Sequence, residues 1–180
     1  MKFLNIANQK GLIEDVIVHR LKVNRDDRGV LVETLKSNWE ELYGNHRPFT
    51  QTYYSITIPG TARDEKLWHV HKFQEDRFIV ISGDLVIALY DNRKDKSTYK
   101  TLNLFTMGEK EGDDGQYLLL VPPDVCHGYC VVSSKSAIML NFPTHLYNPD
   151  DEGRIPLIEI GAILDDGSLF SWKKVLAEFK

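Results

Sequence analysis

This sequence has few cysteines, no excess of positive charge and no long hydrophobic run. Its two cysteines, Cys126 and Cys130, are too few and too closely spaced for a disulfide framework, so we expect free thiols in a reducing compartment. Lysine and arginine number 22 against 26 acidic residues, a balance that does not favour a nucleic-acid or anionic-membrane partner. No segment has the length and apolarity of a signal peptide or membrane span. We therefore expect a soluble, cytoplasmic protein.

Short segments with strand patterns fill most of the chain, separated by turn residues such as Pro59-Gly60. Many short strands at regular spacing predict an all-β sandwich or barrel. Two short helices are also expected, one over 37–43 behind a serine N-cap and one over 172–179. The predicted strands cover 16–23, 28–35, 51–58, 67–73, 77–81, 85–90, 98–105, 117–121, 129–132 and 137–142.

Histidines supply the strongest chemical signal. Residues i and i+2 of a strand point to the same face, so His69 and His71 project side by side. If His127 lies on a neighbouring strand of a closed sheet, three imidazoles meet in one cavity. Such a cluster can hold a metal or work as acid and base, and the structural alternative is a set of partly buried histidines without chemistry.

The pattern around these histidines resembles that of the cupins, a superfamily of small-molecule-binding barrels. His69-x-His71 is followed by Glu75 and Gly83, and a Pro-x-Asp-x-x-His run ends at His127. Asp124 stands in that run where the cupin motif usually has glycine. The resemblance implies a metal-dependent alternative, in which His69, His71, Glu75 and His127 bind a divalent transition metal.

A second set of motifs resembles the dTDP-4-dehydrorhamnose 3,5-epimerases, which are themselves cupins. Residues 25–33 resemble their D-x-R-G-x-x-x-E signature, and further matches in the same order lie at 49–51, 63, 91–99, 121–129 and 144–149. The resemblance covers about residues 12–156. It implies a single cupin jelly-roll domain over 1–180, with a barrel core at about 12–156, short peripheral helices and a divergent tail at about 157–180.

The family resemblance also implies roles for individual residues. A 4-keto nucleotide sugar has acidified hydrogens beside its ketone, and histidine is a natural base for removing one. By resemblance His69 is that base and His71 lies on the same barrel face. The implied nucleotide, diphosphate or sugar contacts are Arg28, Glu33, Gln51, Arg63 and His127. For Arg28 and Glu33 the alternative is a cross-strand surface ion pair.

Three positions depart from the family pattern. Asn141 stands where the family has its tyrosine acid, and Asp76 replaces the lysine that stabilises the enolate. The C-terminal aspartate that orients the catalytic histidine has no clear counterpart, and Asp165 and Asp166 match its position only weakly. Tyr54, Tyr129 and Tyr147 are the tyrosines that could supply a phenol from another strand, and Tyr147 joins the expected catalytic set.

These observations lead to three functional hypotheses. The first is an epimerase or keto-isomerase acting on a dTDP-4-keto-6-deoxyhexose-like nucleotide sugar, with no cofactor favoured. The second is a metal-dependent isomerase or dioxygenase with the three-His/one-Glu site. The third, motivated by Asn141, is a non-catalytic sugar-nucleotide binder. The resemblance further implies a homodimer in which N-terminal strands extend the neighbouring sheet and Arg28 reaches the partner's site.

Overall fold

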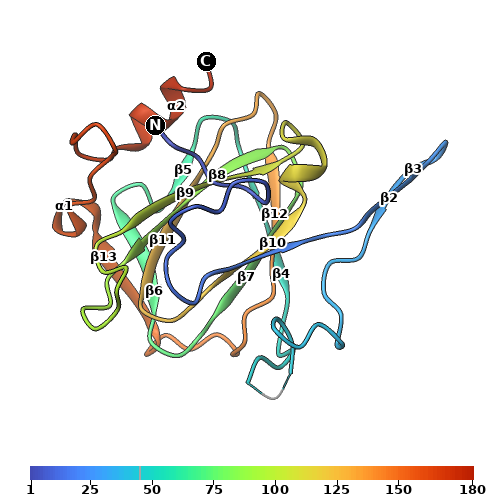
Figure 1. The fold of residues 1–180 in the computed structure, drawn as a ribbon, viewed down its shortest axis with the longest axis horizontal. Helices are drawn as coiled ribbons and strands as arrows, with labels where there is room; N and C mark the ends of the chain where they lie inside the picture. The colour runs from blue at the N-terminus through green and yellow to red at the C-terminus, as the bar shows by residue number, and fades with distance from the viewer. Residues whose placement is uncertain (45) are drawn as a thin grey trace.

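Two antiparallel sheets face each other and enclose the core in the computed structural model, which describes residues 1–44 and 46–180 (Figure 1). The first sheet has the order β1 (Ile17–Arg20), β10 (Tyr117–Val121), β7 (Asp76–Ser82), β12 (Ala137–Asn141) and β4 (Tyr53–Thr57). The second has the order β13 (Glu152–Pro156), β6 (Leu67–His71), β11 (Val125–Val131), β8 (Asp84–Asp91) and β9 (Leu102–Gly108), with β5 (Ala62–Arg63) pairing with β11. The predicted all-β jelly roll is confirmed.

Alternation along β6 places its side chains in two different environments. Trp68 and Val70 point outward into an apolar cluster beneath the C-terminal segment, whereas His69 and His71 point into the barrel. On the inner side, large residues from both sheets, including Phe78, make the main core. The period of two therefore gives one strand both a packing face and a chemical face.

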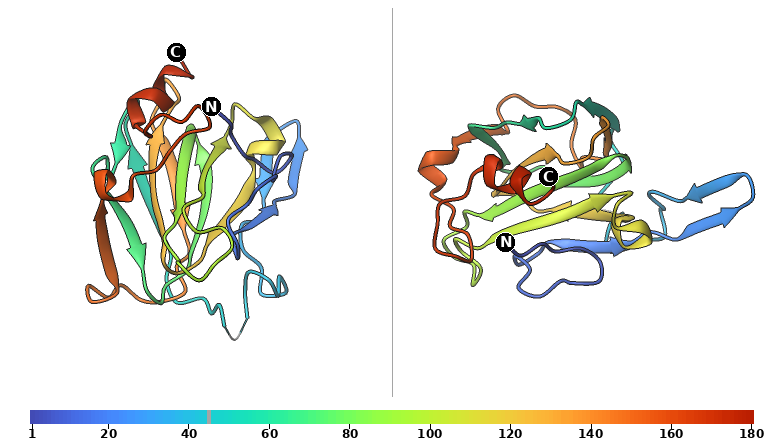
Figure 2. Two further views of the ribbon diagram at one scale, coloured as in Figure 1. Left: turned by 60° about the vertical axis from the view of Figure 1, so that its left-hand side comes forward. Right: turned by 90° about the horizontal axis from the view of Figure 1, so that it is seen from above.

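The C-terminal segment packs on the outer face of the second sheet (Figure 2). It contains α1 (Leu157–Ile160) and α2 (Trp172–Ala177), so the predicted helix near the C-terminus is confirmed. Trp172 is buried with its ring centroid 5.8 Å from that of Trp68. Gly128 lies beneath both rings, where an added Cβ would be 3.3 Å from each. No helix in the described part of the chain has the length and apolarity to cross a membrane.

A two-stranded hairpin projects from the barrel, made of β2 (Val23–Asp26) and β3 (Gly29–Val32) (Figures 1 and 2). The predicted strand at 16–23 is thus divided between β1, which pairs with β10 in the barrel, and β2, which leaves it. Val30 and Leu31 on this hairpin are 58% and 63% exposed. Within one chain the hairpin has an apolar surface that the barrel does not cover.

The predicted helix over 37–43 is wrong, because that segment forms turns. Leu42 donates its amide to the carbonyl of Trp39 rather than continuing a regular helix, and its side chain is buried. The carbonyl of Leu42 accepts a hydrogen bond of 2.7 Å from the buried Arg77 guanidinium. A segment this short has little helical stability of its own, so tertiary contacts decide its shape. The short helix η1 (Gly112–Gly115) lies in a predicted turn.

Candidate active site

Three histidines meet in the barrel, as the neighbouring-strand hypothesis predicted. His127 is the register partner of His69 across β11 and β6, and His71 follows two residues later on β6. One ligand-type atom from each of the three imidazoles lies within 4.8 Å of the others. They line a cavity of about 110 Å³, together with Tyr53, Ser55, Arg63, Asp64, Asp76, Phe78, Gly128, Tyr129 and Met139. This cavity is the candidate active site.

The turn before β11 explains the aspartate at the usual glycine position of the cupin motif. Asp124 has φ +59°, in the left-handed region that favours glycine and that aspartate tolerates better than most residues. Its amide donates to the carbonyl of His71 at 2.7 Å. The turn thereby joins the end of β6 to the start of β11, and the two histidine strands stay in register.

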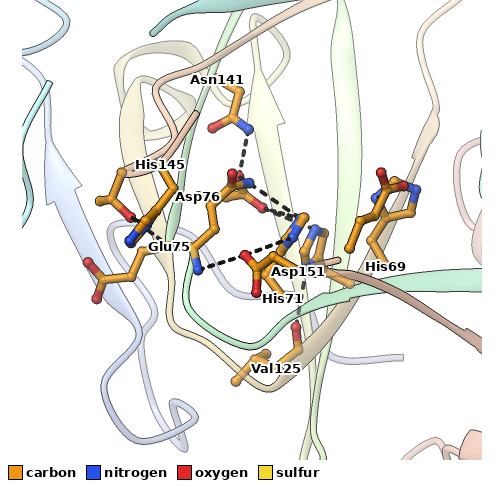
Figure 3. Close-up of polar contacts among 12 residues, drawn as sticks. His69, His71, Glu75, Asp76, Val125, Asn141, His145 and Asp151 are labelled. Atoms are coloured by element: carbon orange, nitrogen blue, oxygen red, sulfur yellow. Dashed lines mark hydrogen bonds and ion pairs between the residues drawn. The ribbon is translucent and has the colours of Figure 1, made fainter. Parts of the chain in front are cut away.

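Asp76 is a buried carboxylate in contact with two of the histidines (Figure 3). Its Oδ2 lies 3.3 Å from His127 Nε2 and 3.6 Å from His71 Nε2. Its Oδ1 accepts hydrogen bonds from the side-chain amides of Gln74 at 2.9 Å and Asn141 at 2.7 Å. The position expected to lose an enolate-stabilising lysine therefore holds a carboxylate that can stabilise a neighbouring imidazolium.

The pKa values of His127 and His71 shift in opposite directions, although both imidazoles face Asp76. Burial opposes charge on both Asp76 and His127, but their contact outweighs it, so the pKa of Asp76 is lowered and that of His127 is raised. Burial lowers the pKa of His71 despite the attraction of Asp76. The site thus favours the charged form of His127 and the neutral form of His71, relative to a free imidazole.

His69 is the most accessible of the three imidazoles, and it has its own carboxylates. Its side chain is 24% exposed, with Nε2 3.0 Å from Asp64 Oδ1 and Nδ1 3.7 Å from Glu152 Oε1. Arg154 donates to both carboxylates, at 2.8 Å and 2.6 Å. Although Asp64 is partly buried, which raises a carboxyl pKa, its contacts with His69 and Arg154 lower the pKa overall. His69 therefore lies between two oriented anions.

The expected C-terminal carboxylates lie elsewhere. Asp165 accepts the backbone amide of Lys2 at 3.1 Å, and Asp166 binds Ser168, so neither contacts a histidine. The carboxylates beside His69 are instead those of Asp64, in the turn before β6, and Glu152, on β13. Glu152 could have been found only with β13 in hand, because the register of β13 against β6 brings it to the histidines.

Asp151 fixes the loop that follows β6. It is buried, and its carboxylate accepts the backbone amides of Lys72, Phe73 and Gln74 at 2.9, 3.0 and 3.1 Å. Its Oδ2 also lies 3.8 Å from His71 Nδ1. One side chain therefore holds both the loop and the second imidazole in place.

The expected fourth metal ligand, Glu75, is turned away from the histidines (Figure 3). Both of its oxygens accept hydrogen bonds from Arg47, at 2.8 and 2.9 Å. The imidazole nitrogens of His69 and His127 contact the carboxylates of Asp64 and Asp76 rather than that of Glu75. The residues present therefore do not fit the three-His/one-Glu metal site.

Of the residues expected to contact the substrate, Arg63 and His127 line the cavity, whereas the others do not. Arg63 lines the cavity beside the histidines. Gln51 donates its side-chain amide to the carbonyl of His145 at 3.0 Å. Arg28 is 84% exposed on the projecting hairpin, paired with Asp26, and Glu33 lies 3.2 Å from Lys36. Arg28 and Glu33 thus form separate local ion pairs rather than the one considered between them.

Two phenols line the cavity, and they are not the expected catalytic one. Tyr147 is 70% exposed and Tyr54 is 65% exposed on the outer face of β4. Tyr129 lines the cavity with its hydroxyl 3.0 Å from Ser55 and 3.1 Å from Thr57. Tyr53, which none of the motifs indicated, also lines the cavity. The alternation along β4, which puts Tyr53, Ser55 and Thr57 on one face, is the signal that could have identified it.

A jelly-roll barrel with inward histidines on neighbouring strands defines a cupin. The family model described as dTDP-4-dehydrorhamnose 3,5-epimerase matches residues 10–162. The chain belongs to this family of nucleotide-sugar epimerases and isomerases, which confirms the resemblance drawn from the motifs.

Named relatives agree with this assignment. The chain is 37% identical over 147 residues to the probable low-salt glycan biosynthesis epimerase Agl13 of Haloferax volcanii, covering 80% of this chain and 88% of that protein. It superposes on a dTDP sugar isomerase of Desulfovibrio desulfuricans with a TM-score of 0.73 at 22% identity, over 89% and 92% of the chains. It also superposes on the epimerase RmlC of Legionella pneumophila, solved in complex with dTDP-4-keto-L-rhamnose. That superposition has a TM-score of 0.66 at 22% identity and covers 78% of this chain and 72% of the Legionella chain.

Proposed function

We propose that this protein epimerises a dTDP-4-keto-6-deoxyhexose-like nucleotide sugar by removing a proton from a carbon beside the ketone. The observation that carries the proposal is the cavity of three imidazoles, each in contact with a carboxylate. The complex of the Legionella relative with a dTDP-4-keto sugar supports the substrate class. Keto-isomerisation begins with the same proton removal and is the other outcome that the substrate could take.

His69 is the proposed base. It is the most exposed imidazole of the three, and Asp64 and Glu152 stabilise the imidazolium that forms when it takes a proton. As the C–H bond breaks, its electron pair moves to the ketone oxygen. His127, whose pKa is raised by Asp76 although burial alone would lower it, supplies a nearby cation for that oxygen, and His71 assists from the same face.

Arg63 is the proposed contact for the diphosphate. It is the arginine that lines the cavity among the described residues, and a guanidinium binds phosphate oxygens in pairs. Gln51 and Glu33 remain proposed nucleotide contacts. Arg28 lies on the hairpin that projects from the barrel and does not line the cavity of its own chain, which supports the proposal that a homodimer brings it to the partner's site.

Solvent exchange tests the proposed reaction. The protein is incubated in D₂O with dTDP-4-keto-6-deoxyglucose, and separately with the UDP sugar, and deuterium in the recovered sugar is measured by mass spectrometry. We expect exchange that His69→Asn reduces by about 10²-fold or more. His19→Asn, which changes a histidine bound to Glu41 outside the site, is the matched control.

Two results would contradict the proposal. Folded protein that binds the nucleotide sugars without any exchange would favour the non-catalytic binder. Exchange that disappears with a chelator and returns with one equivalent of a divalent metal would favour the metal-dependent enzyme.

A further inference from the structure

A row of hydrogen bonds crosses the first sheet from Tyr53 on β4, through Asn141 on β12, to Asp76 on β7. Asn141 donates to the Tyr53 hydroxyl at 2.8 Å and to Asp76 Oδ1 at 2.7 Å. Its own Oδ1 accepts the backbone amide of Arg77 at 3.1 Å. Because that contact requires the amide oxygen, the orientation of the Asn141 side chain is fixed, and both of its N–H groups are donors in this row.

This arrangement determines what the Tyr53 hydroxyl can do. Since Asn141 donates to it, the hydroxyl oxygen is an acceptor there, and its own proton is left for another partner. Among the described residues no acceptor for that proton is found. Tyr53 lines the cavity and is 49% exposed, so a bound sugar can take the vacant position.

The other tyrosines do not offer the same proton. The Tyr129 hydroxyl contacts Ser55 and Thr57, either of which can accept its hydrogen. Tyr54 follows Tyr53 on β4 and points to the opposite face of the sheet, and Tyr147 is exposed on a loop. Tyr53 is therefore the phenol whose free donor faces the histidine cavity.

His69 and Tyr53 come from different sheets. β6 belongs to the second sheet and β4 to the first, and both side chains line the one cavity between them. Epimerisation requires proton removal from one face of a carbon and delivery to the other. We propose that Tyr53 is the acid that completes the proposed epimerisation, an inference that rests on the proposed function.

The step balances without another reactant. His69 takes the proton from carbon, the C–H electron pair forms the enolate, and the enolate then forms a new C–H bond with the Tyr53 proton on the opposite face. Asn141 donates to the resulting phenolate, and solvent returns a proton to Tyr53 and removes one from His69. Burial, followed by the charge of Asp76, raises the pKa of Tyr53 to about 12, which keeps the phenol protonated at neutral pH until it reacts.

Tyr53→Phe tests this assignment, with Tyr54→Phe as the matched control on the opposite face of the same strand. Each variant is incubated in D₂O with dTDP-4-keto-6-deoxyglucose, and two quantities are followed: deuterium in the recovered substrate and formation of the epimer. We expect Tyr53→Phe to lose epimer formation by about 10²-fold or more, since a positioned acid contributes that much. Substrate exchange should stay within a few-fold of wild type, because His69 can return deuterium to the face it came from.

Replacement of Tyr53 by 3-fluorotyrosine gives a second readout that keeps the hydroxyl. A more acidic phenol should move the alkaline limb of the epimerisation rate to lower pH. Three results would overturn the assignment. Tyr53→Phe could form the epimer at the wild-type rate, or it could lose exchange and epimerisation equally. The specific loss of epimerisation could also occur in Tyr147→Phe instead. Absence of exchange in the wild type would instead refute the proposed function itself, and the acid with it.

Discussion

Asp76 and His127 form a buried carboxylate–imidazole pair, with Oδ2 3.3 Å from Nε2, and the same oxygen lies 3.6 Å from His71. One carboxylate thus faces two imidazoles. Because one carboxylate neutralises one positive charge, protonation of both imidazoles beside it would leave His71 with only the more distant Asp151, 3.8 Å away, as a second counter-charge. Burial, with a smaller contribution from the charge of His127, lowers the pKa of His71, whereas the closer contact with Asp76 outweighs burial and raises the pKa of His127.

The first prediction concerns the titration of His127. Asp76→Asn removes the charge that raises its pKa and leaves the opposing effect of burial, so the pKa of His127 should fall below its value in the wild type. Titration of the imidazole carbon-bound protons by NMR measures this. The signals of His19, which contacts Glu41 outside the cavity, are the internal control.

The sign of the stability effect follows from the same shift. A raised pKa means that folded His127 binds its proton more tightly than the unfolded chain does. Its contribution to stability is complete below about pH 6.5 and is lost as the pH rises through the raised value. The free energy of unfolding of wild type relative to Asp76→Asn should therefore shrink on the alkaline side, and an unchanged difference there would contradict the charged pair.

The second prediction separates the carboxylate at the site from the one expected near the C-terminus. Asp64→Asn removes the anion 3.0 Å from His69 and should reduce the exchange rate by about 10²-fold. Asp165→Asn, whose carboxylate binds Lys2, should leave the rate unchanged. The measurement is deuterium uptake at saturating sugar nucleotide, and the reverse order of effects would contradict the assignment of Asp64.

Much of the barrel could be predicted from the sequence, because its strands alternate and are bounded by turn residues. The pairing of His69 with His127 followed from one assumption about strand neighbours. Tyr53 and Glu152 join the site through registers between strands far apart in the chain; alternation gives the face of a strand but not the strand that it pairs with. Asp64 reaches His69 from the turn before β6, whose path no motif described.

Exposure was the other property that motifs could not give. Tyr147 occupies a family-like motif, yet its side chain lies on the surface. Glu75 has the spacing of a metal ligand, but Arg47, 28 residues away, holds it elsewhere. The segment 37–43 has a helical pattern, but contacts with Arg77 decide its path. For Glu75 and for residues 37–43, a tertiary contact outweighs the local signal.

The third prediction concerns Arg77, a fully buried guanidinium. It donates to the carbonyls of Phe142 and Leu42 at 2.5 and 2.7 Å, and to others in the segments that end near the site. Arg77→Leu would leave those carbonyls buried without donors, so we expect a loss of about 3–5 kcal/mol in the free energy of unfolding. Denaturation by urea measures this loss.

Arg20→Leu is the matched control for Arg77. It removes an exposed arginine that pairs with Asp114 at 2.8 Å, and such surface pairs contribute about 0–1 kcal/mol. If the two variants lost the same free energy of unfolding, the hydrogen bonds of Arg77 to the carbonyls of Leu42 and Pro48 would not stabilise the fold.

The fourth prediction concerns the hairpin and the proposed homodimer. Val30 and Leu31 are exposed in one chain, so replacing both with aspartate should convert a dimer into monomers while leaving the barrel folded. Light scattering with gel filtration gives the mass, and far-ultraviolet circular dichroism checks the fold. A monomeric wild type would contradict the dimer, and with it the contribution of Arg28 to a partner's site.

The two walls of the cavity belong to different sheets, so the packing inside the barrel sets the distance between side chains on opposite walls. Phe78 and Met139 line the cavity and also belong to the core that separates the sheets. Their volume therefore sets the width of the gap that the sugar ring would bridge between the proposed base, His69, and the proposed acid, Tyr53. Since interiors are close-packed, a change of one methylene there would alter that gap without touching any polar group. Substrate preference in this barrel can thus change through side chains that make no hydrogen bond to the substrate at all.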